Sequence, residues 1–144
     1  MIEQDTIRLL RECDAGIKMG ISSIQDSVKY VRNDDLRDIL ERSLEEHEHI
    51  KDDMQGLLAD YHDEGKEPAA MAKGMEWFKT NVTLAVDPSD DAVADFITDG
   101  CHMGVKSLAR YLNQYAAADE KSKDISKRLI TEEEHLGKAM RRFL

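Results

Sequence analysis

Glutamate and histidine stand three residues apart at two places in this chain, as Glu46 with His49 and as Glu132 with His135. Residues at positions i and i+3 of an α-helix lie on one face, so each carboxylate and imidazole can bind one metal ion together. Carboxylate and imidazole groups are ligands for iron, manganese and zinc. The two pairs therefore predict a metal centre between two helices.

The spacing of apolar residues predicts helix through almost the whole chain. Only two prolines, Pro68 and Pro88, interrupt the sequence, and apolar residues recur at steps of three and four. The predicted helices cover about 4–31, 34–65, 90–115 and 120–143. We expect Asp34 and Asp35 to cap the second helix and to place negative charge in its first turn.

The connections between these helices predict how they are arranged. Short turns join the first helix to the second and the third to the fourth, whereas the crossover at about 65–89 is long and should contain a helix within about 69–83. This order predicts an all-α, antiparallel four-helix bundle of two helical hairpins with a long, partly helical crossover. We expect residues 1–144 to form a single domain.

An internal repeat indicates that the two hairpins are structurally equivalent. Residues 13–18 read Cys-Asp-Ala-Gly-Ile-Lys, and residues 101–106 read Cys-His-Met-Gly-Val-Lys, at an offset of 88 residues. The two Glu-x-x-His pairs repeat at an offset of 86 residues. Both repeats place corresponding residues in corresponding helices.

The same motifs carry a resemblance to the ferritin-like superfamily. Residues 43–49 resemble the second-helix metal motif of ferritins, and residues 132–135 are similar to the fourth-helix motif of bacterioferritins and rubrerythrins. The resemblance implies that Glu46 and Glu132 bridge two irons and that His49 and His135 each bind one. It also implies iron binding, iron oxidation or peroxide handling, and manganese or zinc stay open as the metal.

The first and third helices should supply the remaining ligands. Asp14 is the better inward-facing acid of the first helix, and His102 occupies the equivalent repeat position in the third. Asp14 lies about five residues, or roughly 7 Å, too far along its helix to face Glu46. The expected family carboxylate is therefore missing from the right place in both the first and the third helix.

The apolar seam favours a different set of inward residues. The apolar seam is the line of apolar residues that faces the bundle interior. In the second helix it passes through His47, so His47 should face inward and His49 should face solvent. In the fourth helix Glu132 and Glu133 lie on either side of the inward face. Cys13, His47, Cys101 and one of these glutamates would then meet inside, hydrogen-bonded together or bound to an ion, because burying them unpaired is costly.

Four glycines lie inside the predicted first and third helices, at Gly16, Gly20, Gly100 and Gly104. Each glycine costs a helix about 1 kcal/mol relative to alanine, so a compensating gain is expected. The two helices either approach each other closely at these positions or leave space there for a bulky neighbour or a ligand.

The composition limits the classes of partner. The formal net charge of −10 disfavours nucleic acid and anionic membrane surfaces. The acidic start of the chain lacks a signal-peptide pattern, and no apolar run reaches membrane-spanning length, so we expect a soluble, cytoplasmic protein. A homo-oligomer, such as a dimer, is expected to cover apolar surface that the bundle leaves over.

Three functions are consistent with these patterns. The first is a ferritin-like protein with a di-metal site, in which iron, two ions per chain, is the expected cofactor. The second is a metal-free ferritin-like bundle with a structural, coat-type or protein-interaction role. The third is a bundle that binds a small ligand in space lined by the glycines. No nucleophile–base pair or phosphate loop in the sequence points to a hydrolase or a nucleotide enzyme.

Overall fold

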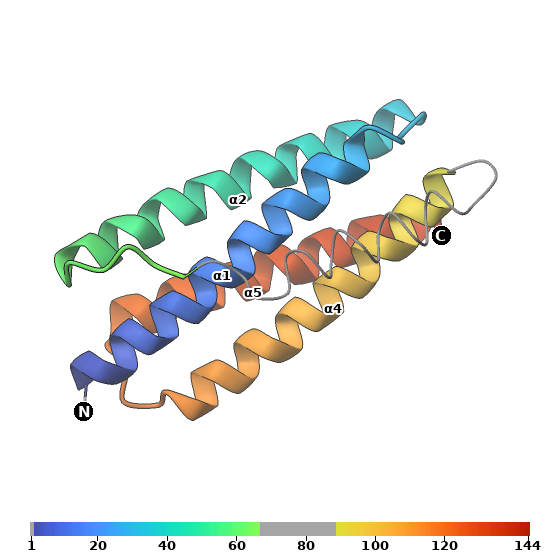
Figure 1. The fold of residues 1–144 in the computed structure, drawn as a ribbon. Coiled ribbons are helices and arrows are strands. Elements are labelled where there is room, and N and C mark those ends of the chain that lie inside the picture. Colours follow the sequence, from blue (N-terminus) through green and yellow to red (C-terminus); the bar gives the residue numbers. More distant parts are fainter. Residues whose placement is uncertain (1, 67–88) are drawn as a thin grey trace.

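The computed structural model describes residues 2–66 and 89–144, which form four long helices and a short 3-10 helix. These elements are α1 (Ile2–Val28), α2 (Asp34–Asp60), α4 (Asp90–Gln114), α5 (Glu120–Met140) and η1 (Arg141–Phe143). Helix α1 packs along α2 and helix α4 packs along α5, so two helical hairpins make up the bundle (Figure 1). The predicted all-helical four-helix bundle is confirmed for these residues. The helix predicted within 69–83 lies outside them.

The residue that caps the N-terminus of helix α2 is Asn33, which directly precedes the helix. The side-chain oxygen of Asn33 accepts hydrogen bonds from the backbone N–H groups of Asp35 (2.8 Å) and Leu36 (3.1 Å), so Asn33 is the N-cap. The prediction that Asp34 and Asp35 cap this helix is wrong in that respect. Their carboxylates lie in the first turn, where they interact favourably with the positive end of the helix dipole.

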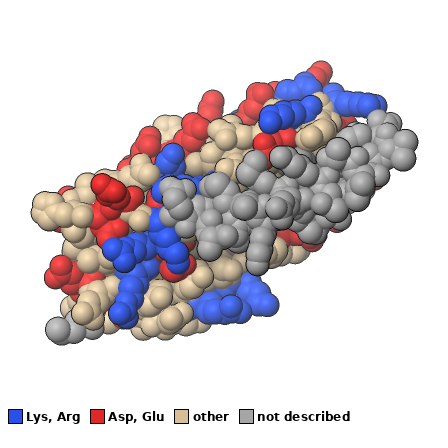
Figure 2. Space-filling view, viewed as in Figure 1, with Lys and Arg blue, Asp and Glu red and all other residues tan. Residues whose placement is uncertain are grey.

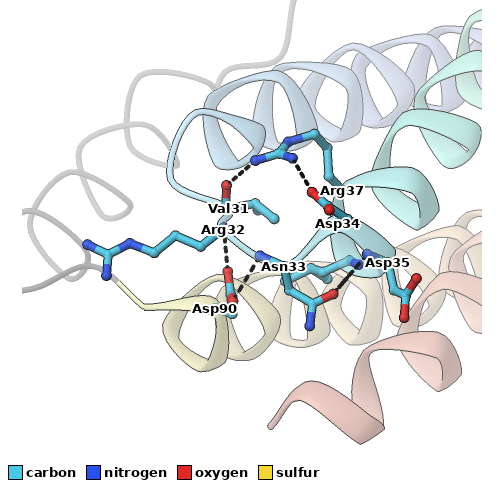
Figure 3. A network of polar contacts seen from close by, with 8 residues as sticks. Val31, Arg32, Asn33, Asp34, Asp35, Arg37 and Asp90 are labelled. Carbon is cyan, nitrogen blue, oxygen red and sulfur yellow. Dashed lines mark hydrogen bonds and ion pairs between the residues drawn. The ribbon is translucent and has the colours of Figure 1, made fainter.

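The turn between α1 and α2 is tied to the start of α4. The carboxylate of Asp90 accepts hydrogen bonds from the backbone N–H groups of Arg32 (2.8 Å) and Asn33 (3.1 Å), as Figure 3 shows. Arg37 closes the turn from the other side by donating to the Val31 carbonyl at 2.6 Å. These contacts fix one end of the α1–α2 hairpin to the α4–α5 hairpin.

The apolar core consists of two clusters at opposite ends of the bundle. The first cluster includes Leu36, Leu40, Ile97 and Leu136, and the second includes Ile17, Ile50, Met54 and Leu129. His47 on α2 and Glu133 on α5 lie between the two sets along their helices, and both are buried. The middle of the core is therefore polar, although both ends are apolar.

The surface carries charges of both signs close together. Acidic and basic side chains lie beside each other at several places on the face shown in Figure 2. Arg128, for example, bridges Asp53 (2.6 Å) and Glu46 (3.1 Å) between α5 and α2. No helix within residues 2–66 and 89–144 is both long enough and apolar enough to cross a membrane.

Candidate functional site

The three histidines predicted as metal ligands lie at the surface. The side chains of His49, His102 and His135 are exposed on three different helices, α2, α4 and α5. In the described part of the chain, no group of three or more histidine, cysteine, aspartate or glutamate side chains could hold a metal ion. The ferritin-like metal centre therefore stays a prediction from the sequence.

The three predicted carboxylate ligands have other partners. Glu46 pairs with Arg128, and Glu132 accepts a hydrogen bond from the Ser43 hydroxyl at 2.8 Å. Asp14 is fully buried and pairs with the Lys18 ammonium at 2.7 Å. The structure thus uses these carboxylates for contacts between and within helices rather than bringing them to one point.

A histidine–glutamate pair instead occupies the middle of the core. His47 Nε2 lies 2.5 Å from Glu133 Oε1, and its Nδ1 lies 2.7 Å from the Ser43 carbonyl oxygen. His47 has no exposed surface and Glu133 is 9% exposed. A carbonyl oxygen can only accept, so Nδ1 carries a proton, and Nε2 can donate a second one to the carboxylate. An imidazolium bound to a carboxylate satisfies both contacts.

The surroundings of His47 favour its protonated form. Burial acts to lower its pKa, but the hydrogen bond to Glu133 and the negative charge of that carboxylate act in the opposite direction. The hydrogen bond to the Ser43 carbonyl and the nearby charge of Glu132 also act to raise it. The pKa of His47 is therefore higher than its ordinary value. The proton thus stays on this imidazole at a higher pH than on a free histidine.

The two cysteines occupy different environments. Burial, followed by the charge of the nearby Glu133 carboxylate, raises the pKa of the Cys101 thiol. The Cys13 thiol lies 3.0 Å from the Ser126 hydroxyl, and burial raises the pKa of Cys13 to about 12. Of the inward set expected from the seam, His47, Glu133 and Cys101 meet, whereas Cys13 lies apart from them.

A pocket of about 360 Å³ lies between α1 and α4 and reaches the His47–Glu133 pair. A Cβ atom at Gly20 would lie 3.2 Å from His47 Cδ2, and one at Gly104 would lie 3.5 Å from Glu133 Oε2. At Gly16 and Gly100 a Cβ would meet no described atom within 4 Å. Among the described residues, these glycines line open space between α1 and α4.

The walls of the pocket change in polarity along its length. Helices α1 and α4 run antiparallel (Figure 1), so Ile24 and Phe96 lie toward one end of the pocket, and Glu12 and Tyr111 lie toward the other. The Lys66 ammonium reaches that second end and lies 2.6 Å from Glu12 Oε1. Sequence patterns gave no sign of Lys66, because it follows the end of α2 and belongs to no helical repeat.

Comparisons with protein-family models, with curated proteins and with solved structures give no match for this chain. The chemistry of its site is therefore inferred from its own residues. Those residues offer a mostly apolar pocket with a few convergent polar groups, which is the usual form of a small-molecule site.

Proposed function

We propose that this protein binds a small, largely apolar molecule that carries a hydrogen-bond donor, in the pocket between α1 and α4. The observation that supports this function is that the buried His47–Glu133 pair faces the pocket. A polar pair at the inner wall of an apolar pocket fixes the orientation of a ligand and selects its polar group.

The free bonding capacity of Glu133 determines the kind of polar group. An ionised carboxylate only accepts hydrogen bonds, and its two oxygens offer about four acceptor positions. His47 uses one position on Oε1, and Oε2 lies toward Gly104, which also lines the pocket. A ligand hydroxyl or N–H group would therefore donate to Glu133.

The size of the pocket suits a molecule of about two fused rings. An apolar cavity of roughly 150 Å³ is enough to bind benzene. The pocket here has about 360 Å³, which leaves room for a bicyclic compound such as 2-naphthol. The apolar wall formed by Ile24, Phe96 and Leu136 would contact the rings.

The energetics of buried ion pairs also favour a functional role for the His47–Glu133 pair. Replacing a buried ion pair by apolar residues of similar volume is often neutral or stabilising by about 1–4 kcal/mol. Stability alone therefore gives little reason to hold an imidazolium and a carboxylate between two apolar clusters. Ligand recognition supplies such a reason.

Fluorescence titration with 2-naphthol tests this function. We expect saturable binding by the unmodified protein and at least tenfold weaker binding by Gly16→Leu, whose new side chain would fill the open space beside Gly16. Gly56→Leu is the matched control, because Gly56 is also an exposed helical glycine but lies outside the pocket. Absence of saturable binding, or equal binding by the two variants, would rule the function out.

A further inference from the structure

The segment that follows α2 is held firmly on α1. Arg11 pairs with Asp63 at 2.5 Å, and Asp63 Oδ1 accepts a hydrogen bond from the Gly65 N–H at 2.9 Å. The next N–H group, that of Lys66, donates to the buried carboxylate of Asp14 at 3.1 Å. Gly65 has a φ of 90°, a conformation that glycine adopts readily, which lets the chain turn here. Three side-chain contacts thus fix the backbone position of Lys66.

This fixed backbone places the Lys66 side chain at one end of the pocket. Its ammonium donates to Glu12 at 2.6 Å. An ammonium has three donors, and the bond to Glu12 is the one that Lys66 makes with a described side chain. Lys66, Glu12 and Tyr111 all line the pocket.

The Lys66 end and the His47–Glu133 pair are separate polar points. Glu12 lies beside Lys66, and Gly20 lies beside His47. The eight residue-to-residue steps from Glu12 to Gly20 correspond to about 12 Å along α1 at a helical rise of 1.5 Å per residue. A molecule that contacts both points is therefore elongated and carries a polar group at each end.

The charges at the Lys66 end indicate which polar group fits there. The positive charge of Lys66 is already balanced by Glu12, and the whole chain has a formal net charge of −10. A ligand carboxylate would lie close to the Glu12 carboxylate and be repelled. An uncharged acceptor oxygen can take a hydrogen bond from Lys66 without that repulsion.

Given the proposed function, on which this inference rests, we propose that Lys66 determines ligand specificity by donating a hydrogen bond to an uncharged carbonyl oxygen. The ligand class is then an elongated, uncharged molecule with a hydroxyl or N–H group at the end near Glu133. Its carbonyl group, from a ketone, ester or amide, lies at the end near Lys66.

Two probes of nearly equal shape test this specificity, namely 6-acetyl-2-naphthol and 6-ethyl-2-naphthol, of which only the first has a carbonyl oxygen. We expect the unmodified protein to bind the acetyl compound about tenfold more tightly, which is the usual effect of one hydrogen bond to a charged group. Lys66→Met should remove this advantage and bind the two compounds with equal affinity. Lys106→Met, at an exposed lysine of α4 outside the pocket, should keep the advantage.

The outcomes separate the specificity of Lys66 from the existence of the site. Equal affinity of the unmodified protein for both probes, or an acetyl advantage that survives in Lys66→Met, would overturn the role of Lys66 and leave the pocket function standing. Tighter binding of 6-hydroxy-2-naphthoic acid than of the acetyl compound would overturn the uncharged ligand class. If neither compound binds, the proposed function and the role of Lys66 both fall.

Discussion

The contact between His47 and Glu133 is the main polar feature of the core, and it joins the two hairpins of the bundle. It runs from α2 to α5 over 2.5 Å and lies between two apolar clusters. Removing one member would leave a buried charge without its partner, which costs far more than losing an exposed ion pair.

We predict that Glu133→Ala lowers the free energy of unfolding by about 3 kcal/mol, because His47 would keep its charge without a carboxylate or would have to lose its proton. The neighbouring exposed residue gives the control, since Glu134→Ala should change this free energy by no more than about 0.5 kcal/mol. Urea unfolding followed by circular dichroism measures both values. Equal effects of the two substitutions would show that the pair is not a buried ion pair.

The raised pKa of His47 predicts a pH dependence of stability. Because the pKa of His47 is higher in the folded state than its unfolded value of about 6.5, its stabilising contribution is full below that pH. The contribution is then lost as the pH rises through the folded pKa. Unfolding free energies of the unmodified protein should fall as the pH rises above about 6.5.

Two variants show whether this fall comes from His47. Glu133→Gln removes the charge that holds the proton, so its stability should fall less over the same range. His49→Gln, which changes an exposed histidine of the same helix, should keep the full dependence. An unchanged pH dependence in Glu133→Gln would contradict the assignment to this pair.

The apolar seam predicted part of this site at the level of single residues. It indicated that His47, rather than His49, faces inward, and that Glu132 or Glu133 lies opposite; the structure pairs His47 with Glu133. The Glu-x-x-His spacing could not show which way each side chain faces. That depends on how a helix is rotated against its neighbours, and tertiary packing decides the rotation.

At the level of helices, the segment from Asp63 to Lys66 depends on one glycine. We predict that Gly65→Ala lowers the free energy of unfolding by at least about 1 kcal/mol, because its φ of 90° is unfavourable for alanine. A Cβ there would also press against the buried carboxylate of Asp14. Urea unfolding measures the change.

Gly56→Ala should instead raise the free energy of unfolding. Gly56 lies within α2, and a Cβ there would meet no described atom within 4 Å. Alanine should therefore stabilise the helix by about 0.5–1 kcal/mol. Destabilisation by both substitutions, or by neither, would contradict the role of Gly65 in this turn.

The helices themselves were predictable from the sequence, and their ends less so. The apolar periodicity gave all four long helices, with differences of a few residues at their ends. The cap of α2 was missed because Asn33, Asp34 and Asp35 are all good capping residues, and only the backbone geometry distinguishes them. The contacts of Lys66 with Asp14 and Glu12 join distant parts of the chain, which no local pattern reveals.

At the scale of the whole molecule, the metal prediction and the pocket function can be separated. The resemblance to ferritins predicts about two iron, manganese or zinc ions per chain, measured by elemental analysis of protein purified without chelator, and their loss when Glu46 and Glu132 are both changed to alanine. The pocket function predicts that the same double variant binds 2-naphthol like the unmodified protein, since neither residue lines the pocket. Loss of naphthol binding in this variant would contradict the pocket function.

The four glycines that line the pocket also allow binding to be observed at the site itself. In a nitrogen-15 correlation spectrum of the whole protein titrated with 2-naphthol, we predict saturable shifts of the backbone amide signals of Gly16, Gly20, Gly100 and Gly104, all with one dissociation constant. The amide signal of Gly56, which lies on α2 outside the pocket, should stay in place. Signals of the four glycines that do not move, or that move no more than the signal of Gly56, would contradict ligand binding between α1 and α4.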